Sequence, residues 1–160
     1  MARNIAPQSA WTNPLHFITF GFGSGAMPYA PGTFGTLACI PFYLMAQGLV
    51  WWQYLVLTVI VALIGIYLCG RTCKEIGVHD HPGTVFDEFV GFFVTMIMAP
   101  SGWMWVLIGF ILFRVFDIWK PFPIKWFDEN VQGGFGVVLD DIIAGIYALI
   151  ILQIIAIPFR

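Results

Sequence analysis

The chain contains long apolar stretches in which no side chain carries a charge. From Phe34 to Gly70 there is no Asp, Glu, Lys or Arg, and charged residues make up only 10% of the 160 residues. Soluble domains normally carry about 25% charged residues. Because so few charges cannot cover a water-facing surface, we expect an integral membrane protein. A chain of this length is expected to form a single domain over residues 1–160.

Five apolar segments can be placed between the polar parts of the sequence. They cover residues 34–50, 54–70, 85–99, 103–119 and 138–157. The third is short for a transmembrane helix, which needs about 20 residues. It either tilts or begins below the membrane surface, with its acidic residues inside a protein cavity. The expected fold is all-α: a polytopic membrane helical bundle of about five hydrophobic segments.

Residues 1–33 are rich in Gly and Pro, so a cytoplasmic or interfacial segment is expected there. A short helix around residues 15–20 fits this interpretation. Thr33 is a candidate N-cap for the first apolar segment.

The basic residues predict the orientation in the membrane. If the segments alternate in direction, Arg3, Arg71, Lys74, Lys120 and Lys125 all fall on one side. The positive-inside rule then places the N-terminus and both polar loops in the cytoplasm. With seven Lys and Arg and no basic run, the chain has no surface that would follow a nucleic acid.

Three groups of charged residues stand at the ends of apolar segments. A charge inside the membrane costs about 2.5–3.5 kcal/mol on insertion scales, so such residues by default indicate function. All three groups fall on the predicted cytoplasmic side, although the rule used to orient the chain counts only Lys and Arg. We therefore expect one site there, formed by Asp87-Glu88, by Arg114, Asp117 and Lys120, and by Asp140-Asp141.

Arg114, Asp117 and Lys120 are spaced i, i+3, i+6 and share one helix face. A surface ion pair with a snorkelling lysine is the alternative interpretation. Such a pair contributes only about 0–1 kcal/mol and would not offset the cost of an arginine inside an apolar segment. Arg114 and Lys120 are therefore expected to bind phosphate oxygens. Weaker candidates for phosphate binding are the hydroxyls of Ser24, in the glycine-rich stretch 21–25, and of Thr33.

The acidic pairs could also serve only to complement helix dipoles. Adjacent acids point about 100° apart on a helix, so one can bind a metal while the other supports it. Carboxylate ligands without cysteine favour a hard cation, Mg²⁺ before Ca²⁺. The three groups together supply five carboxylates that could bind such a cation or act as a base.

A cation beside basic side chains is the arrangement that phosphoryl transfer requires, and the lipid setting suggests a phospholipid ester. The sequence has no Cys-x5-Arg and no Asp-x-Asp motif. Attack by a water that the metal activates, with a carboxylate as base, is therefore favoured.

Five stretches follow one another along nearly the whole chain: Gly23-Ser24-Gly25, residues 31–35, Asp87-Glu88, residues 114–121 and residues 136–145. In combination they resemble the phosphatidylglycerophosphatase A family. The resemblance implies a bacterial, multi-pass inner-membrane phosphatase that depends on Mg²⁺ and converts phosphatidylglycerophosphate to phosphatidylglycerol and phosphate. It also implies that the metal ligands and the catalytic base come from Asp87, Glu88, Asp140 and Asp141, joined by Asp117, and that Arg114 and Lys120 hold the phosphate.

An alternative is a small membrane transporter or ion-conducting protein that uses the same carboxylates as a cation site. That class favours charges near the middle of the membrane and repeated segments. No internal repeat is visible and the acids lie at segment ends, so this interpretation is weaker. The expected partners are the phospholipid substrate and the bilayer, without nucleic acid. The oligomeric state, the base and the number of metal ions are left open.

Overall fold

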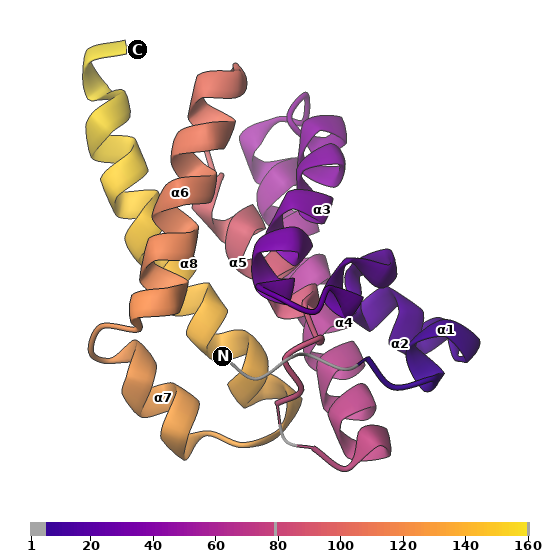
Figure 1. Ribbon diagram of the computed structural model, residues 1–160. Helices are drawn as coiled ribbons and strands as arrows, with labels where there is room; N and C mark the ends of the chain where they lie inside the picture. The colour runs from indigo at the N-terminus through magenta and orange to yellow at the C-terminus, as the bar shows by residue number, and fades with distance from the viewer. Residues whose placement is uncertain (1–5, 79, 160) are drawn as a thin grey trace.

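The computed structural model describes residues 6–78 and 80–159, and over this part of the chain the regular structure is entirely helical (Figure 1). Arg3, used above for orientation, lies outside the described residues. The elements are α1 (Ser9–Thr12), α2 (Pro14–Thr19), η1 (Gly21–Ala26), α3 (Pro31–Ala46), α4 (Trp51–Ile76), α5 (Phe86–Thr95), α6 (Trp103–Trp119), α7 (Ile124–Asn130), α8 (Gly133–Ala156) and η2 (Ile157–Phe159).

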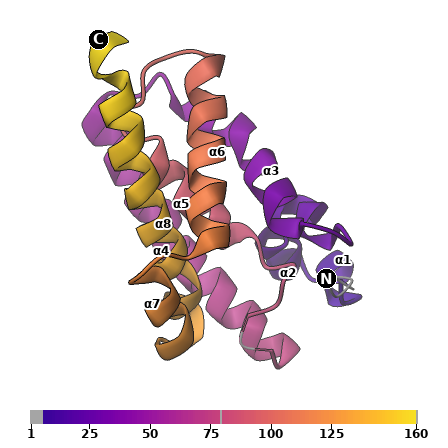
Figure 2. The same ribbon diagram turned by 60° about the vertical axis from the view of Figure 1, so that its left-hand side comes forward.

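Helix α5 lies at the centre of the bundle. All ten of its residues are buried, and α3, α4, α6 and α8 all contact it (Figures 1 and 2). Glycines allow α5 and α8 to cross closely: a Cβ at Gly91 would lie 2.8 Å from the carbonyl oxygen of Asp141. Ten residues rise only about 15 Å, roughly half of a hydrocarbon core. The third apolar segment is short because protein surrounds it, and its acids enter the bundle interior.

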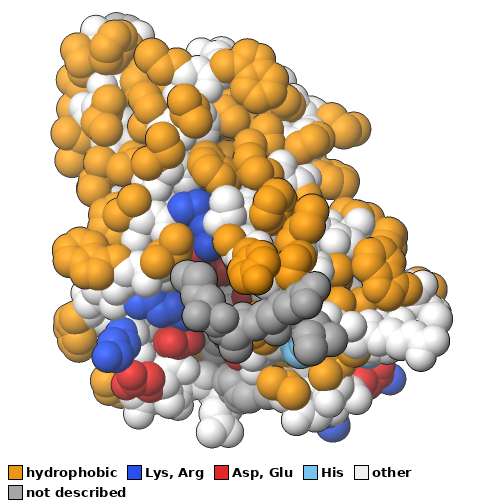
Figure 3. Space-filling model, viewed as in Figure 1, with side chains coloured by type: hydrophobic (Ala, Val, Ile, Leu, Met, Phe, Trp, Pro, Cys, Tyr) orange, Lys and Arg blue, Asp and Glu red, His pale blue; other side chains and the backbone are white. Residues whose placement is uncertain are grey.

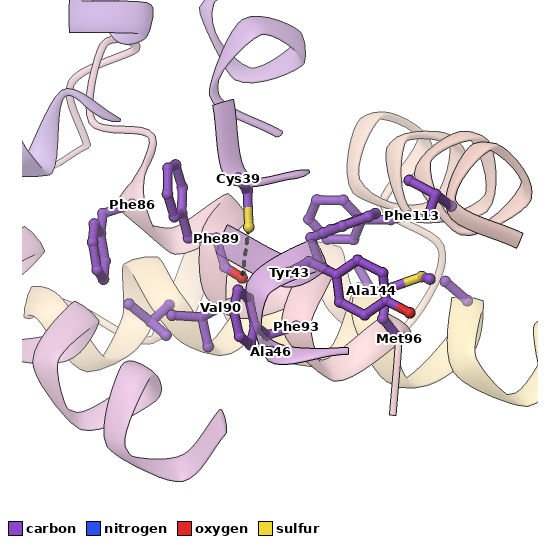
Figure 4. Close-up of a cluster of buried hydrophobic side chains, with 14 of the residues drawn as sticks. Cys39, Tyr43, Ala46, Phe86, Phe89, Val90, Phe93, Met96, Phe113 and Ala144 are labelled. Atoms are coloured by element: carbon purple, nitrogen blue, oxygen red, sulfur yellow. Dashed lines mark hydrogen bonds between the residues drawn. The ribbon is translucent and has the colours of Figure 1, made fainter. Parts of the chain in front are cut away.

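The core around α5 is mostly aromatic and closely packed. Figure 4 shows Phe86, Phe89 and Phe93 projecting from α5 among the side chains of neighbouring helices. Tyr54 of α4 reaches into this core and donates a hydrogen bond of 2.9 Å to the carbonyl oxygen of Phe93. The core also holds the thiol of Cys39, which is 3.8 Å from the carbonyl oxygen of Phe89. Buried aromatic packing therefore fixes α5 relative to α3 and α4.

Two helices, α4 and α8 extended by η2, are long and apolar enough to cross a membrane. The 26 residues of α4 rise about 39 Å, against about 30 Å for a hydrocarbon core. Only 28% of the most apolar window in each helix is buried. Large apolar side chains such as Val59 and Leu63 therefore face outward, which favours a lipid environment. Helices α3 and α6 have 16 and 17 residues and rise only about 24–26 Å.

The helices alternate in direction, which brings the polar residues to one end. In Figure 1 α3, α5 and α8 run upward, and α4 and α6 run downward. In Figure 3, the same view, charged side chains occupy the middle and lower part of the visible face, while the upper part is hydrophobic. Exposed tryptophans at the start of α4 and of α6, Trp51, Trp52 and Trp103, lie at the opposite end. Aromatic residues in such positions are typical of a membrane interface.

The N-terminal segment differs from the prediction in detail. The short helix expected near residues 15–20 is present as α2, where His16 Nε2 lies 3.0 Å from Oε2 of Glu75 on α4. Thr33 is not an N-cap: α3 already begins at Pro31, and the capping residue is Ala30 in the left-handed conformation. Proline is favoured in the first helical position because its fixed φ suits the helix and it has no N–H to satisfy.

The second polar loop contains a helix that was not predicted, α7. Its residue Ile124 is buried, and α7 packs against α8. Seven residues are too few to show a clear apolar periodicity, which explains why the sequence pattern did not reveal it.

Candidate active site

Arg114 joins α6 to α5 through an ion pair. Its Nη1 donates a hydrogen bond of 3.2 Å to Oε1 of Glu88, and the same nitrogen pairs with Asp117 one turn further along α6. The arginine side chain is only 13% exposed. Its Nε has no hydrogen-bond partner among the described residues. A buried guanidinium held by two carboxylates therefore keeps one N–H donor available.

The Glu88 carboxylate packs directly against two glycines on the first turns of α3. A Cβ at Gly32 would overlap Oε1 of Glu88 and lie 2.9 Å from Nη1 of Arg114. A Cβ at Gly35 would overlap Oε2 of Glu88. Within the described part of the chain, Oε2 has no hydrogen-bond partner. The α3 backbone therefore approaches the Glu88–Arg114 pair as closely as only glycine permits.

Lys120 ends α6 and is held by two carboxylates. It adopts the left-handed conformation with φ 45°, and its Nζ lies 2.7 Å from Oδ2 of Asp140 and 2.9 Å from Oδ1 of Asp128. Burial alone would lower the pKa of Lys120, but Asp140 and Asp128 outweigh it and raise that pKa above its ordinary value. The lysine therefore carries its positive charge at neutral pH. The sequence did not predict Asp128, because it lies on the unforeseen helix α7.

Asp87 and Asp141 are two further acids of the cluster. Both are buried, on the adjacent helices α5 and α8. The carboxylate of Asp141 is repelled by those of Asp117, Asp87 and Asp140. Among the described residues, no Lys or Arg forms an ion pair with Asp87 or Asp141. Such a concentration of negative charge favours a cation between these helices.

The donor chemistry fits Mg²⁺. Oxygen is the only ligand type that the five carboxylates offer, and Oδ1 of Asp140 is a further buried oxygen without a hydrogen-bond partner in the described structure. Over the same residues, no three His, Cys, Asp or Glu side chains form a preassembled metal site. Mg²⁺ does not require one, since it is usually held by one or two carboxylates together with phosphate oxygens and water.

The structure brings together the seven charged residues that were predicted from the sequence. The two hydroxyl candidates, Ser24 and Thr33, lie in different settings. The hydroxyl of Ser24 donates a 2.8 Å hydrogen bond to the carbonyl oxygen of Gly21 within its own loop. Thr33 lies on the first turn of α3, next to Gly32. Phosphate binding by either hydroxyl stays a prediction.

Comparison with known proteins identifies the family. The family described as Phosphatidylglycerophosphatase A matches residues 17–156. The chain is 48% identical over 145 residues to Phosphatidylglycerophosphatase A of Escherichia coli, which covers 90% of this chain and 84% of that protein. The protein of the same name from Haemophilus influenzae is 47% identical over 141 residues, covering 87% of this chain and 86% of that protein.

A relative from Bacteroides thetaiotaomicron, provisionally named a phosphatidylinositol-3-phosphatase, is 35% identical over 142 residues, covering 84% of this chain and 88% of that protein. No solved structure matches the chain. The family model covers most of the sequence, and so do the alignments with both proteins of the same name. The chain belongs to the phosphatidylglycerophosphatase A family.

Proposed function

We propose that this protein is a Mg²⁺-dependent phosphatase of the bacterial inner membrane that hydrolyses the terminal phosphate of phosphatidylglycerophosphate. The products are phosphatidylglycerol and inorganic phosphate, and the site faces the cytoplasm. The names of two relatives support the substrate. The observation that carries the chemistry is the meeting of Arg114 and Lys120 with carboxylates from α5, α6 and α8.

The two basic side chains would bind the phosphate. A phosphate monoester carries a charge of about −1.5 to −2 at pH 7, so cationic side chains are its preferred protein ligands. Arg114 has a free Nε–H donor and a guanidinium plane fixed by Glu88 and Asp117. Arginine in such a fixed position holds phosphate oxygens with defined geometry. Lys120 would hold a second oxygen from the end of α6.

The carboxylates divide into two roles. Asp87 and Asp141, which form no ion pair with a Lys or Arg among residues 6–78 and 80–159, would hold Mg²⁺, which when bound supplies a Lewis acid for the phosphate oxygens. Glu88 and Asp140 each give one oxygen to a cation and keep the other without a hydrogen-bond partner in the described structure. Either free oxygen suits a general base that removes a proton from the attacking water. The water oxygen bonds to phosphorus, the P–O bond to the glycerol breaks, and a proton passes to the leaving oxygen.

The position of the site suits a lipid substrate. The proposed phosphate ligands belong to the charged end of the bundle, and the surface above that end is hydrophobic on the face seen in Figure 3. A phospholipid could therefore keep its chains in the bilayer while its headgroup reaches the site. The cytoplasmic orientation follows from Arg71, Lys74 and Lys125, which share this end.

The test is phosphate release from phosphatidylglycerophosphate by the detergent-purified protein, with Mg²⁺ and with EDTA. We expect release that requires Mg²⁺ and is lost in Asp87→Asn. Gly48→Ala is the control, because a Cβ there meets nothing within 4 Å. Release that continues unchanged in EDTA would refute the metal requirement. No release from folded protein would refute the phosphatase assignment and favour the transporter alternative.

A further inference from the structure

An apolar groove of about 410 Å³ lies between α3 and α4, apart from the charged cluster. Its floor is formed by Phe86, Phe89 and Phe93 of α5, and every side chain that lines it is apolar. The rings of Phe86 and Phe89 stack with centroids 5.2 Å apart (Figure 4). Ligand pockets commonly measure about 300–1,000 Å³. A groove of this size without a polar lining suits a hydrocarbon chain rather than a headgroup.

The groove begins at the same end of α5 as the acids of the candidate active site. Phe86 directly precedes Asp87 at the start of the helix, and Phe93 lies seven residues further, about 10 Å along the axis. The groove therefore begins at the level of the acids and extends toward the apolar end of the bundle. A molecule with its phosphate at the acids and a hydrocarbon tail beside α5 would match this arrangement.

The glycine-rich stretch 21–25 places an aromatic ring at the polar end of the groove. Phe22 has φ 57°, a left-handed conformation that is costly for a residue with a side chain. Its ring stacks on Phe42 of α3 at 5.4 Å, and Phe42 in turn contacts Phe89 at 5.7 Å. Strained backbone of this kind is concentrated at functional sites. This loop therefore helps to build the groove.

The groove opens sideways onto the surface that lipid would cover. Met45 on its rim is 84% exposed, and Leu49 is also exposed. Beside the groove residues Leu57 and Val61 on α4, the side chains of Ile60 and Ile64 are exposed as well. An occupant can therefore enter from within the bilayer without passing through water.

We propose that this groove binds one acyl chain of the phospholipid substrate while the terminal phosphate lies at Arg114 and Lys120. This inference rests on the proposed function. A chain that leaves the bilayer for an apolar groove exchanges one hydrocarbon environment for another, so the groove contributes orientation more than affinity. Orientation of the scissile phosphate is the larger source of rate.

A substitution that fills the groove far from the acids tests this. Leu57→Trp on α4 places a large ring in the groove, and Leu63→Trp is the matched control, since Leu63 is 63% exposed on the outer face of the same helix. With dioleoyl phosphatidylglycerophosphate, Leu57→Trp should lower kcat/KM on the order of tenfold. With the dihexanoyl lipid, whose chains are too short to reach Leu57, the rate should stay near wild type. Leu63→Trp should leave both rates unchanged.

Three results would overturn the proposal: no effect of Leu57→Trp on either lipid, an equal loss with both lipids, or the same loss in Leu63→Trp. If Leu57→Trp does not fold, photolabelling of the wild-type protein tests whether the groove binds an acyl chain. A phosphatidylglycerophosphate with a diazirine near the end of one acyl chain should label Leu57 and Phe93. Excess unlabelled phosphatidylglycerophosphate should compete, and excess phosphatidylcholine should not.

Labelling spread over the outer faces of α4 and α8, with equal competition by both lipids, would show ordinary bilayer contact and refute the groove. The two proposals fail separately in these experiments. Groove labelling without phosphate release would refute the phosphatase and leave the acyl site. Phosphate release without groove labelling would refute the acyl site alone.

Discussion

The contact between Gly32 and the Glu88–Arg114 pair predicts that one methyl group will disable the site without unfolding the protein. In Gly32→Ala, the new Cβ would overlap Oε1 of Glu88 and lie 2.9 and 3.0 Å from the two Nη atoms of Arg114. The atoms it meets are the ends of long side chains, so they can move while the backbone of α3 stays in place. The expected damage is therefore local, and it falls on the arginine that would hold the phosphate.

The size of each effect can be worked out. Overpacking a buried site costs about 1–3 kcal/mol, and replacing a helical glycine by alanine returns about 0.5–1 kcal/mol. The free energy of unfolding should therefore fall by no more than about 2.5 kcal/mol, the difference between the largest cost and the smallest gain. Displacing one preorganised donor from a reacting charge lowers kcat by about 100-fold to 1,000-fold. Turnover should thus fall much more than stability.

The assay combines phosphate release from phosphatidylglycerophosphate with thermal unfolding of the same detergent-purified sample. Gly48→Ala provides the same substitution at a position where the added Cβ meets nothing within 4 Å, and it should behave as wild type. A Gly32→Ala protein that turns over within about twofold of wild type would show that the position of Arg114 does not limit the reaction. A protein that loses its folded transition altogether would refute the claim that the damage is local.

The remaining predictions concern the other charged contacts. Asp141→Asn should abolish phosphate release but unfold at the same or a higher temperature, because it replaces a buried acid that has no basic partner among the described residues by a neutral amide; near-normal release would exclude Asp141 from the site. Asp128→Asn should raise KM several-fold by removing one of the two carboxylates on Lys120, whereas Glu129→Gln, which loses only an exposed pair, should not. The raised pKa of Lys120 means that its stabilising charge is present below about pH 10 and is lost only as the pH rises further. KM should therefore not rise through Lys120 between about pH 6 and 9, and a rise in that range that disappears in Lys120→Met would contradict this.

Ion pairs hold the two cations of the cluster in place. Each cation in the cluster is already held by carboxylates, Arg114 by Glu88 and Asp117 and Lys120 by Asp140 and Asp128. These pairs fix the cations before a substrate arrives. Preorganised charge of this kind stabilises a transition state without reorganisation during the reaction.

Much of the helical architecture could be predicted from residue order. The uncharged run from Phe34 to Gly70 is too apolar to face water. Helix α6 has the bounds that were predicted for the fourth apolar segment, with Gly102 and Lys120 as its capping residues. Helix α7 and the early start of α3 at Pro31 were missed, because short helices and proline starts leave little periodic signal.

The sequence by itself determined that the chain is apolar, helical and charged only near the ends of its segments, because these properties depend on local composition and spacing. Only the tertiary structure decided which charges pair. Periodicity places Asp87 and Glu88 on different sides of α5, but it cannot say that Glu88 meets Arg114 while Asp87 lies close to Asp141. That choice depends on how α3, α6 and α8 cross α5, and the crossing is set by glycine contacts and aromatic packing between segments far apart in the chain.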